Sequence, residues 1–212
     1  MLRRSSAAKP SPRNTADRPD EPMYDAIEDP YCYPGTTVLK NRAGHRTQRA
    51  LTQFETAMSA QRADEPLPIG RLSVHHYQAI HRHLFQDVYS WAGTFRTVRI
   101  SKDGSMFCYP EHIRSQMRTL FGRLRREHCF RDLTPDEFVR KATTFLATLN
   151  AIHPFRDGNG RTQLAFMALL TARAGHSLLL GRLHARRFLN AMVKSFHGDQ
   201  QPLQIELRKL VD

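Results

Sequence analysis

Apolar residues recur at intervals of three or four along most of this 212-residue chain. This spacing places them on one face of a helix, where they can pack against a core. From about residue 43 onward the pattern therefore predicts several amphipathic helices. The groups that carry it are Leu51, Phe54 and Met58; Tyr77, Ile80 and Leu84; Ile113, Met117, Leu120, Phe121 and Leu124; and the stretches 164–174 and 186–196.

The clearest helix start lies at residues 134–137, Thr-Pro-Asp-Glu. The threonine hydroxyl can cap the first turn, proline needs no amide donor there, and the acidic side chains face the positive end of the helix dipole. Apolar residues continue at helical spacing over 138–152. Because Pro154 disfavours helical conformation in the residue before it, we expect the helix to end at His153.

Residues 95–109 break the helical pattern. Apolar residues alternate with polar ones from Val98 to Ser101, and Asp103 and Gly104 are typical of a tight turn. This segment predicts a short β-hairpin. The expected fold class is therefore all-α, mainly helical, with one short hairpin.

Residues 1–22 differ in composition from the rest and are rich in Ser, Pro, Arg, Asp and Ala. They carry too little apolar surface to offset the entropy lost on ordering, so we expect a disordered basic tail. The remaining residues, 23–212, have the length of one domain.

We expect no membrane partner, because no stretch approaches the ~20 apolar residues that span a bilayer. The odd number and wide spacing of Cys32, Cys108 and Cys129 fit a reducing cytoplasm.

The chain is strongly basic, with 32 Lys and Arg against 20 Asp and Glu and a formal net charge of +12. Such a charge attracts nucleic acid, anionic membranes and nucleotides alike, so the charge alone does not identify a binding partner. The arginines of residues 114–126 lie beside an apolar stripe, and we interpret them as the solvated face of a helix rather than a nucleic-acid site. Five histidines lack the i, i+4 spacing of a helical zinc motif, and we interpret them as solvated helix residues. They are His75, His76, His81, His83 and His112.

Residues 153–161, His-Pro-Phe-Arg-Asp-Gly-Asn-Gly-Arg, combine side chains suited to phosphate chemistry. Gly158 and Gly160 stand at the predicted start of a helix, where amide groups and the helix dipole attract an anion. Asn159 can donate from its amide, and Arg161 can bind phosphate oxygens through two N–H groups. The segment therefore predicts a nucleotide site, with a plain turn after a helix stop as the structural alternative.

Two residues of this segment are candidates for the reaction itself. The imidazole of His153, with an ordinary pKa of ~6.5, can accept a proton from an attacking hydroxyl near neutral pH. The carboxylate of Asp157 is a hard oxygen ligand that suits a Mg²⁺ ion bridging phosphates. The residues alone thus indicate Mg²⁺-nucleotide binding beside a proton acceptor.

The segment fills every fixed position of the signature H-x-F-x-[D/E]-G-N-G-R, and the chain resembles the Fic family over about residues 30–200. Residues 90–93, Ser-Trp-Ala-Gly, and the hairpin after them also resemble that family. The resemblance implies a Fic domain over 23–212 and a protein adenylyltransferase. Such an enzyme transfers AMP from ATP to a Ser, Thr or Tyr hydroxyl of a target protein, and pyrophosphate leaves.

The resemblance also assigns roles to individual residues. It implies His153 as the general base, Asp157 as the Mg²⁺ ligand, and residues 158–161 (Gly158, Asn159, Gly160 and Arg161) as the phosphate site. The predicted hairpin is similar to the family's flap, which aligns the target by adding it as a strand to an exposed edge. The flap candidates are Ile100, Ser101, Lys102, Gly104 and Ser105.

One position departs from the family pattern, because Leu164 stands where many members carry a second arginine that meets the γ-phosphate. An impaired nucleotide binder and an enzyme that uses another nucleotide are therefore alternative interpretations, and a basic nucleic-acid-binding module is a more distant one.

Regulation can also be searched for in the sequence. Many family members are silenced by a Ser/Thr-x-x-x-Glu-Gly/Asn motif, which no glutamate of this chain completes. The resemblance thus implies either a separate small antitoxin or an uninhibited enzyme. Small single-domain members are often bacterial toxins, so a bacterial cytoplasm is the expected location.

Overall fold

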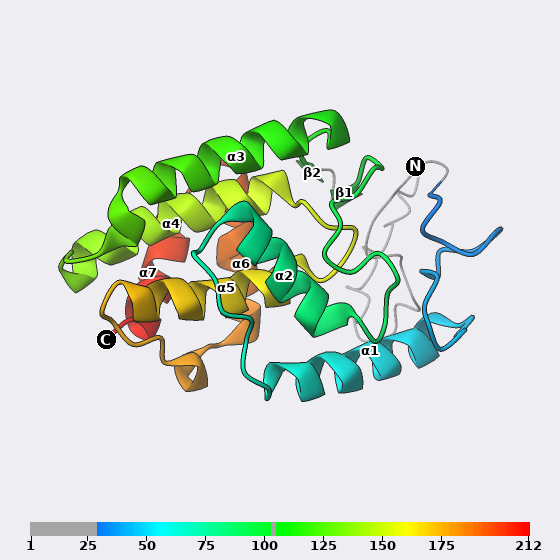
Figure 1. The fold of residues 1–212 in the computed structure, drawn as a ribbon. Coiled ribbons are helices and arrows are strands. Elements are labelled where there is room, and N and C mark those ends of the chain that lie inside the picture. Colours follow the sequence, from blue (N-terminus) through cyan, green and yellow to red (C-terminus); the bar gives the residue numbers. More distant parts are fainter. Residues whose placement is uncertain (1–28, 103–104) are drawn as a thin grey trace, which may run out of the picture.

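The computed structural model describes residues 29–102 and 105–212. The predicted tail at 1–22 and the turn residues Asp103 and Gly104 lie outside these ranges. Figure 1 shows a bundle of helices with one small hairpin at its edge, so the predicted all-α fold class is confirmed. The helices and strands of the described residues are α1 (Gln48–Ala63), α2 (Val74–Phe85), β1 (Ser101–Lys102), β2 (Ser105–Met106), α3 (Pro110–Arg126), η1 (His128–Phe130), α4 (Pro135–Ile152), α5 (Asn159–Arg173), η2 (Leu180–Arg182), α6 (Ala185–Phe196) and α7 (Gln201–Leu210).

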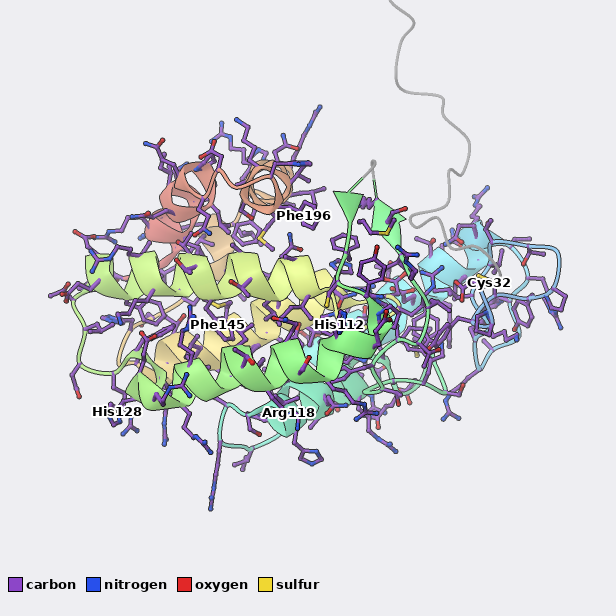
Figure 2. All side chains as sticks on the ribbon, turned by 90° about the horizontal axis from the view of Figure 1, so that it is seen from above. Cys32, His112, Arg118, His128, Phe145 and Phe196 are labelled. Atoms are coloured by element: carbon purple, nitrogen blue, oxygen red, sulfur yellow. The ribbon has the colours of Figure 1, made fainter. Side chains whose placement is uncertain are left out.

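Helix α4 is the centre of the fold and contacts α3, α5, α6 and α7. Its predicted start is confirmed by a capping box, in which Thr134 and Glu137 bond each other's backbone amides. Figure 2 shows Phe145 of α4 in the layer between α3 and the α6–α7 pair. The buried face of α4 consists of Phe138, Val139, Ala142, Thr143, Phe145, Leu146, Ala147, Leu149 and Ile152. In the described part of the chain, no helix is both long and apolar enough to cross a membrane.

The predicted hairpin exists but is shorter than its sequence pattern suggests. Ser101 pairs with Met106 and Lys102 with Ser105, whereas Val98 and Ile100 lie outside the strands. A physical reason is visible at Val98, whose carbonyl accepts a hydrogen bond from a buried arginine side chain instead of a facing strand. The alternation in the sequence therefore reflects burial of Ile100 rather than an extended ladder.

The interpretation of the helix α2 histidines as solvated is wrong for two of them. His76 and His81 are buried, and both bond backbone groups through their rings. Their positions on the packed side of α2, beside Tyr77 and Ile80, explain the burial. The arginines of α3 are exposed, as the sequence analysis expected.

Candidate active site

His153 lies at the C-terminal end of α4 and has left-handed backbone dihedrals, with φ of 46° and ψ of 63°. Such a conformation costs a non-glycine residue on the order of 1 kcal/mol, and it turns the chain out of the helix. The ring stacks on Phe107 of the hairpin segment, with 3.9 Å between ring centroids and 19° between planes. Its side chain is therefore covered by the flap, and the residue is only 8% exposed.

Burial, together with the smaller effects of the positive charges of Arg96 and Lys102, lowers the pKa of His153 to about 3. The reference pKa of ~6.5 for an unperturbed imidazole therefore does not describe His153 in this conformation, because Phe107 of the hairpin segment covers the ring. At neutral pH the imidazole is uncharged and can accept a proton. Anionic phosphates placed nearby would raise its pKa toward the ordinary value.

The loop that follows is held in shape by Asn159. Its side-chain carbonyl accepts a hydrogen bond from the Phe155 amide at 3.0 Å, and its amide donates to the Phe155 carbonyl at 2.9 Å. Phe155 itself is fully buried and stacks on His81, with ring centroids 3.7 Å apart. In this structure Asn159 therefore shapes the loop at the start of α5.

The two glycines of the loop have different surroundings. Gly158 is the N-cap of α5, with φ of 77°, and a Cβ atom there would lie 2.4 Å from the ring of Phe85. Gly158 therefore needs both the conformational freedom and the small size of glycine. Gly160 is exposed, and a Cβ atom there would meet no atom of the described residues within 4 Å outside its own stretch of helix. Its surface is therefore open to a ligand at the helix N-terminus.

Asp157 is buried beside this helix start, and its carboxylate accepts a hydrogen bond from the Gly158 amide. Burial and then the charge of Glu55 raise its pKa to about 6. A single carboxylate that faces a phosphate site fits Mg²⁺, which usually binds one or two protein carboxylates together with substrate phosphates and water. Asp157 is thus the residue that would hold the ion.

Arg161 points from α5 toward α1, where its guanidinium pairs with Glu55 and donates to the Ser59 hydroxyl at 2.8 Å. The Tyr89 hydroxyl donates to the second oxygen of the same carboxylate. Glu55 and Ser59 are not among the site residues predicted from the sequence. A signal was present, because Leu51, Glu55 and Ser59 share one face of α1 at a spacing of four.

His81 connects α2 to the signature loop. Its Nδ1 accepts a hydrogen bond from the Gly93 amide at 2.8 Å, so Nε2 carries the proton and donates to the Asp157 carbonyl at 3.0 Å. Burial lowers the pKa of His81 to about 3. The neutral ring thus supports the backbone of Asp157, a role that the histidine spacing did not suggest.

A cavity of about 390 Å³ brings the predicted residues together. His153, Asp157, Arg161 and Lys102 line its polar side, and residues 158–160 line the side formed by the start of α5. The apolar lining includes Leu164, Leu183, Phe188, Met192, Val193 and Phe196. Of the predicted flap residues, Lys102 lines this cavity, whereas Ile100 and Ser101 do not. Gly104 and the side chain of Ser105 lie outside the described part of the chain.

A cavity lined by both polar and apolar side chains suits a molecule with phosphates and a heterocyclic base. The volume lies within the range of small-molecule sites. A second cavity of about 500 Å³ lies against α1 and shares Asp157 and Arg161 with the first. These two residues therefore form a wall between the cavities.

Comparison with known proteins identifies the family of this chain. The family described as the Fic/DOC family matches residues 71–171. A probable protein adenylyltransferase of Sinorhizobium fredii, y4lH, is 50% identical over 189 residues, which are 89% of this chain and 98% of that protein. The probable protein adenylyltransferase Fic of Escherichia coli is 32% identical and is covered over 92% of its length, against 86% of this chain.

Among solved structures, BepC of Bartonella tribocorum, a VirB-translocated effector with bound AMPPNP, superposes with a TM-score of 0.78. It is 25% identical, and the match covers 86% of this chain and 96% of that one. The chain therefore belongs to the Fic/DOC family. It is a nucleotidyltransferase of the protein adenylyltransferase class, the activity for which its relatives are named.

Proposed function

We propose that this enzyme transfers AMP from Mg²⁺-bound ATP to a Ser, Thr or Tyr hydroxyl of a target protein, with His153 as the general base. The observation that carries the proposal is the cavity in which His153, Asp157 and the N-terminus of α5 face one another. A buried neutral imidazole beside an anion site provides a proton acceptor next to a phosphate.

In the proposed reaction the target hydroxyl oxygen attacks the α-phosphorus of ATP while His153 accepts the hydroxyl proton. The bond between the α-phosphorus and the bridging oxygen breaks, and pyrophosphate leaves with the electron pair. The first-turn amides of α5 stabilise negative charge on the phosphates. A Mg²⁺ ion held by Asp157 would neutralise phosphate charge when bound.

The flap is proposed to align the target through its backbone. Ile100 is buried, so it can contribute only main-chain groups, whereas Ser101 and Lys102 are half-buried at the strand edge. Gly104 and Ser105 belong to the same proposed edge. Lys102 also lines the cavity and can attract phosphate oxygens from the flap side.

The test incubates the purified chain with α-labelled ATP, Mg²⁺ and a bacterial lysate and follows labelled protein bands. We expect the wild type to label protein and His153→Ala to label none while still binding ATP. Chelation of Mg²⁺ with EDTA should also abolish labelling. Equal labelling by wild type and His153→Ala would contradict the role of His153.

Leu164 lines the cavity with an apolar side chain, so this position offers no charged group to a phosphate of the nucleotide. We propose that ATP binds mainly through its α- and β-phosphates, because Arg161 and Lys102 are the basic residues lining the cavity in the described part of the chain. Competition of the labelling reaction by unlabelled ATP, ADP and other nucleoside triphosphates tests this. An enzyme that prefers another nucleotide would show stronger competition by that nucleotide.

We also propose that regulation comes from a separate small antitoxin in a bacterial cytoplasm, since no glutamate of this chain completes the inhibitory motif. Glu55 does pair with a signature arginine, but it belongs to α1 and takes part in the fold. Co-expression with small proteins encoded nearby, followed by co-purification and a labelling assay, tests this proposal. Full activity in every such combination would contradict it.

A further inference from the structure

Arg96 is among the largest buried side chains of the described residues, with 2% of its surface exposed. Its guanidinium donates to four backbone carbonyls. Nε donates to His153 at 2.8 Å, and the two terminal nitrogens donate to Val98 at 2.6 Å, to Cys108 at 2.6 Å and to Ile152 at 3.3 Å. A buried charge is costly, so this arrangement requires that its N–H groups be satisfied by well-placed acceptors.

The four carbonyls come from two parts of the molecule. Ile152 is the last residue of α4 and His153 is its C-cap, where carbonyl groups lack intrahelical partners and carry the negative end of the helix dipole. Val98 and Cys108 lie on the two stems of the flap, one before β1 and one after β2. One side chain therefore joins both flap stems to the backbone of the catalytic histidine.

Neighbouring contacts strengthen the same junction. The Arg96 amide donates to the Pro154 carbonyl at 2.9 Å, and the Cys108 amide donates to the Ala151 carbonyl at 3.1 Å. Phe107, next to Cys108, stacks on the His153 ring. Each stem of the flap thus donates a backbone hydrogen bond to the chain around the end of α4.

We propose that Arg96 is a positioning residue that holds His153 and the flap in fixed register. The inference rests on the proposed function, in which the flap aligns the target hydroxyl and His153 accepts its proton. An arginine suits this task because its planar fork reaches several acceptors at once, which a lysine ammonium cannot do in the same geometry. The hydrogen bonds of Arg96 reach backbone carbonyls, including those of His153 and Pro154, so its proposed role in the reaction is indirect.

The variants Arg96→Lys and Arg96→Met are compared with wild type in the labelling assay at varied ATP concentration. We expect the turnover number to fall about 10- to 100-fold, because a misplacement of about 1 Å between reacting groups has effects of this size. The KM for ATP should stay within about twofold, since residues 157–161 are unchanged. Arg118→Lys, an exposed arginine on α3, is the matched control and should behave as wild type (Figure 2).

A second measurement begins with the wild type, so its first result does not depend on the variants folding. Native-state hydrogen exchange is followed at the amides of Arg96, Cys108 and His153. If Arg96 joins the flap to α4, these amides open together with one free energy. In Arg96→Lys, the Cys108 amide should exchange faster while amides within α5 keep their rates.

Three outcomes separate the possibilities. Unchanged turnover in folded Arg96→Lys and Arg96→Met would overturn the inference, and so would a Cys108 amide in the wild type that exchanges far faster than that of His153. No labelling by the wild type despite ATP binding would instead contradict the proposed function, and the exchange measurement would still decide whether Arg96 joins the flap to α4.

Discussion

Gly158 and Gly160 look equivalent in the sequence, as two glycines of one phosphate-binding pattern, yet the structure separates them. Gly158 packs against Phe85 and has a positive φ, so its role concerns the fold. Gly160 has an ordinary φ and an open surface in the cavity, so its role concerns a ligand. The difference depends on Phe85, more than seventy residues away in the chain, which no local pattern contains.

Replacement of each glycine by alanine tests this separation. Gly158→Ala should lower the free energy of unfolding by about 2 kcal/mol or more, because the methyl group meets Phe85 and the backbone is left-handed. Gly160→Ala should leave stability unchanged or raise it by up to ~1 kcal/mol, since alanine favours a helix. It should nevertheless weaken ATP binding, because the methyl group occupies the anion site. Urea unfolding and calorimetric ATP titration give the two quantities, and equal loss of stability in both variants would contradict the argument.

At the scale of elements, helices were predicted most accurately where several local sequence signals agree. Helix α4 was predicted from its cap to its end at His153, because Thr134, a proline and an apolar stripe all indicate the same helix. Helix α7 is not among the predicted helices, and its Pro202 lies in the first turn, where proline is tolerated. Glu55 was missed because the role of a carboxylate on a packed helix face becomes clear only when its partner, Arg161, is known.

The capping box of α4 is a separate element-scale prediction. Thr134→Ala removes the hydroxyl that caps the helix and should cost about 1 kcal/mol. For a domain of this size that corresponds to a Tm lower by roughly 2–4 °C. Labelling activity at moderate temperature should be retained, because His153 lies at the opposite end of the helix. Thr148→Ala, on the exposed face of α4, is the control and should change stability by less than ~0.5 kcal/mol. A Tm loss of the same size in both variants would show that the cap is not the cause.

At the scale of the whole molecule, the site depends on contacts between distant segments. Arg156 of the signature forms a buried ion pair with Asp29, 127 positions away, and Arg161 reaches α1. His81 bonds the Asp157 carbonyl from α2. The sequence identified the loop at 153–161 but could not show these partners, because each is fixed only when the helices pack. The burial that perturbs the titrating groups of the site arises at the same stage.

These groups make stability depend on pH in a defined direction. An unfolded histidine binds a proton below about pH 6.5, whereas burial lowers the pKa of His81 and of His153 to about 3 in the folded state. Their contribution is therefore complete above pH 6.5 and is lost as pH falls. Asp157 acts in the opposite direction, because its pKa is raised to about 6. Its contribution is present at low pH and is lost as pH rises through 6.

Between pH 6 and pH 5 the unfolded state should therefore bind about one proton more than the folded state, two from the histidines against one for Asp157. Without divalent metal, the free energy of unfolding should then fall by roughly 1 kcal/mol per pH unit on acidification in this window. His81→Gln removes one of the two histidines, so it should be less stable at pH 7.5 but nearly independent of pH between 6 and 5. Urea unfolding in EDTA at pH 7.5, 6 and 5, followed by circular dichroism, measures both slopes. The same slope in wild type and His81→Gln would show that burial does not keep His81 in its neutral form.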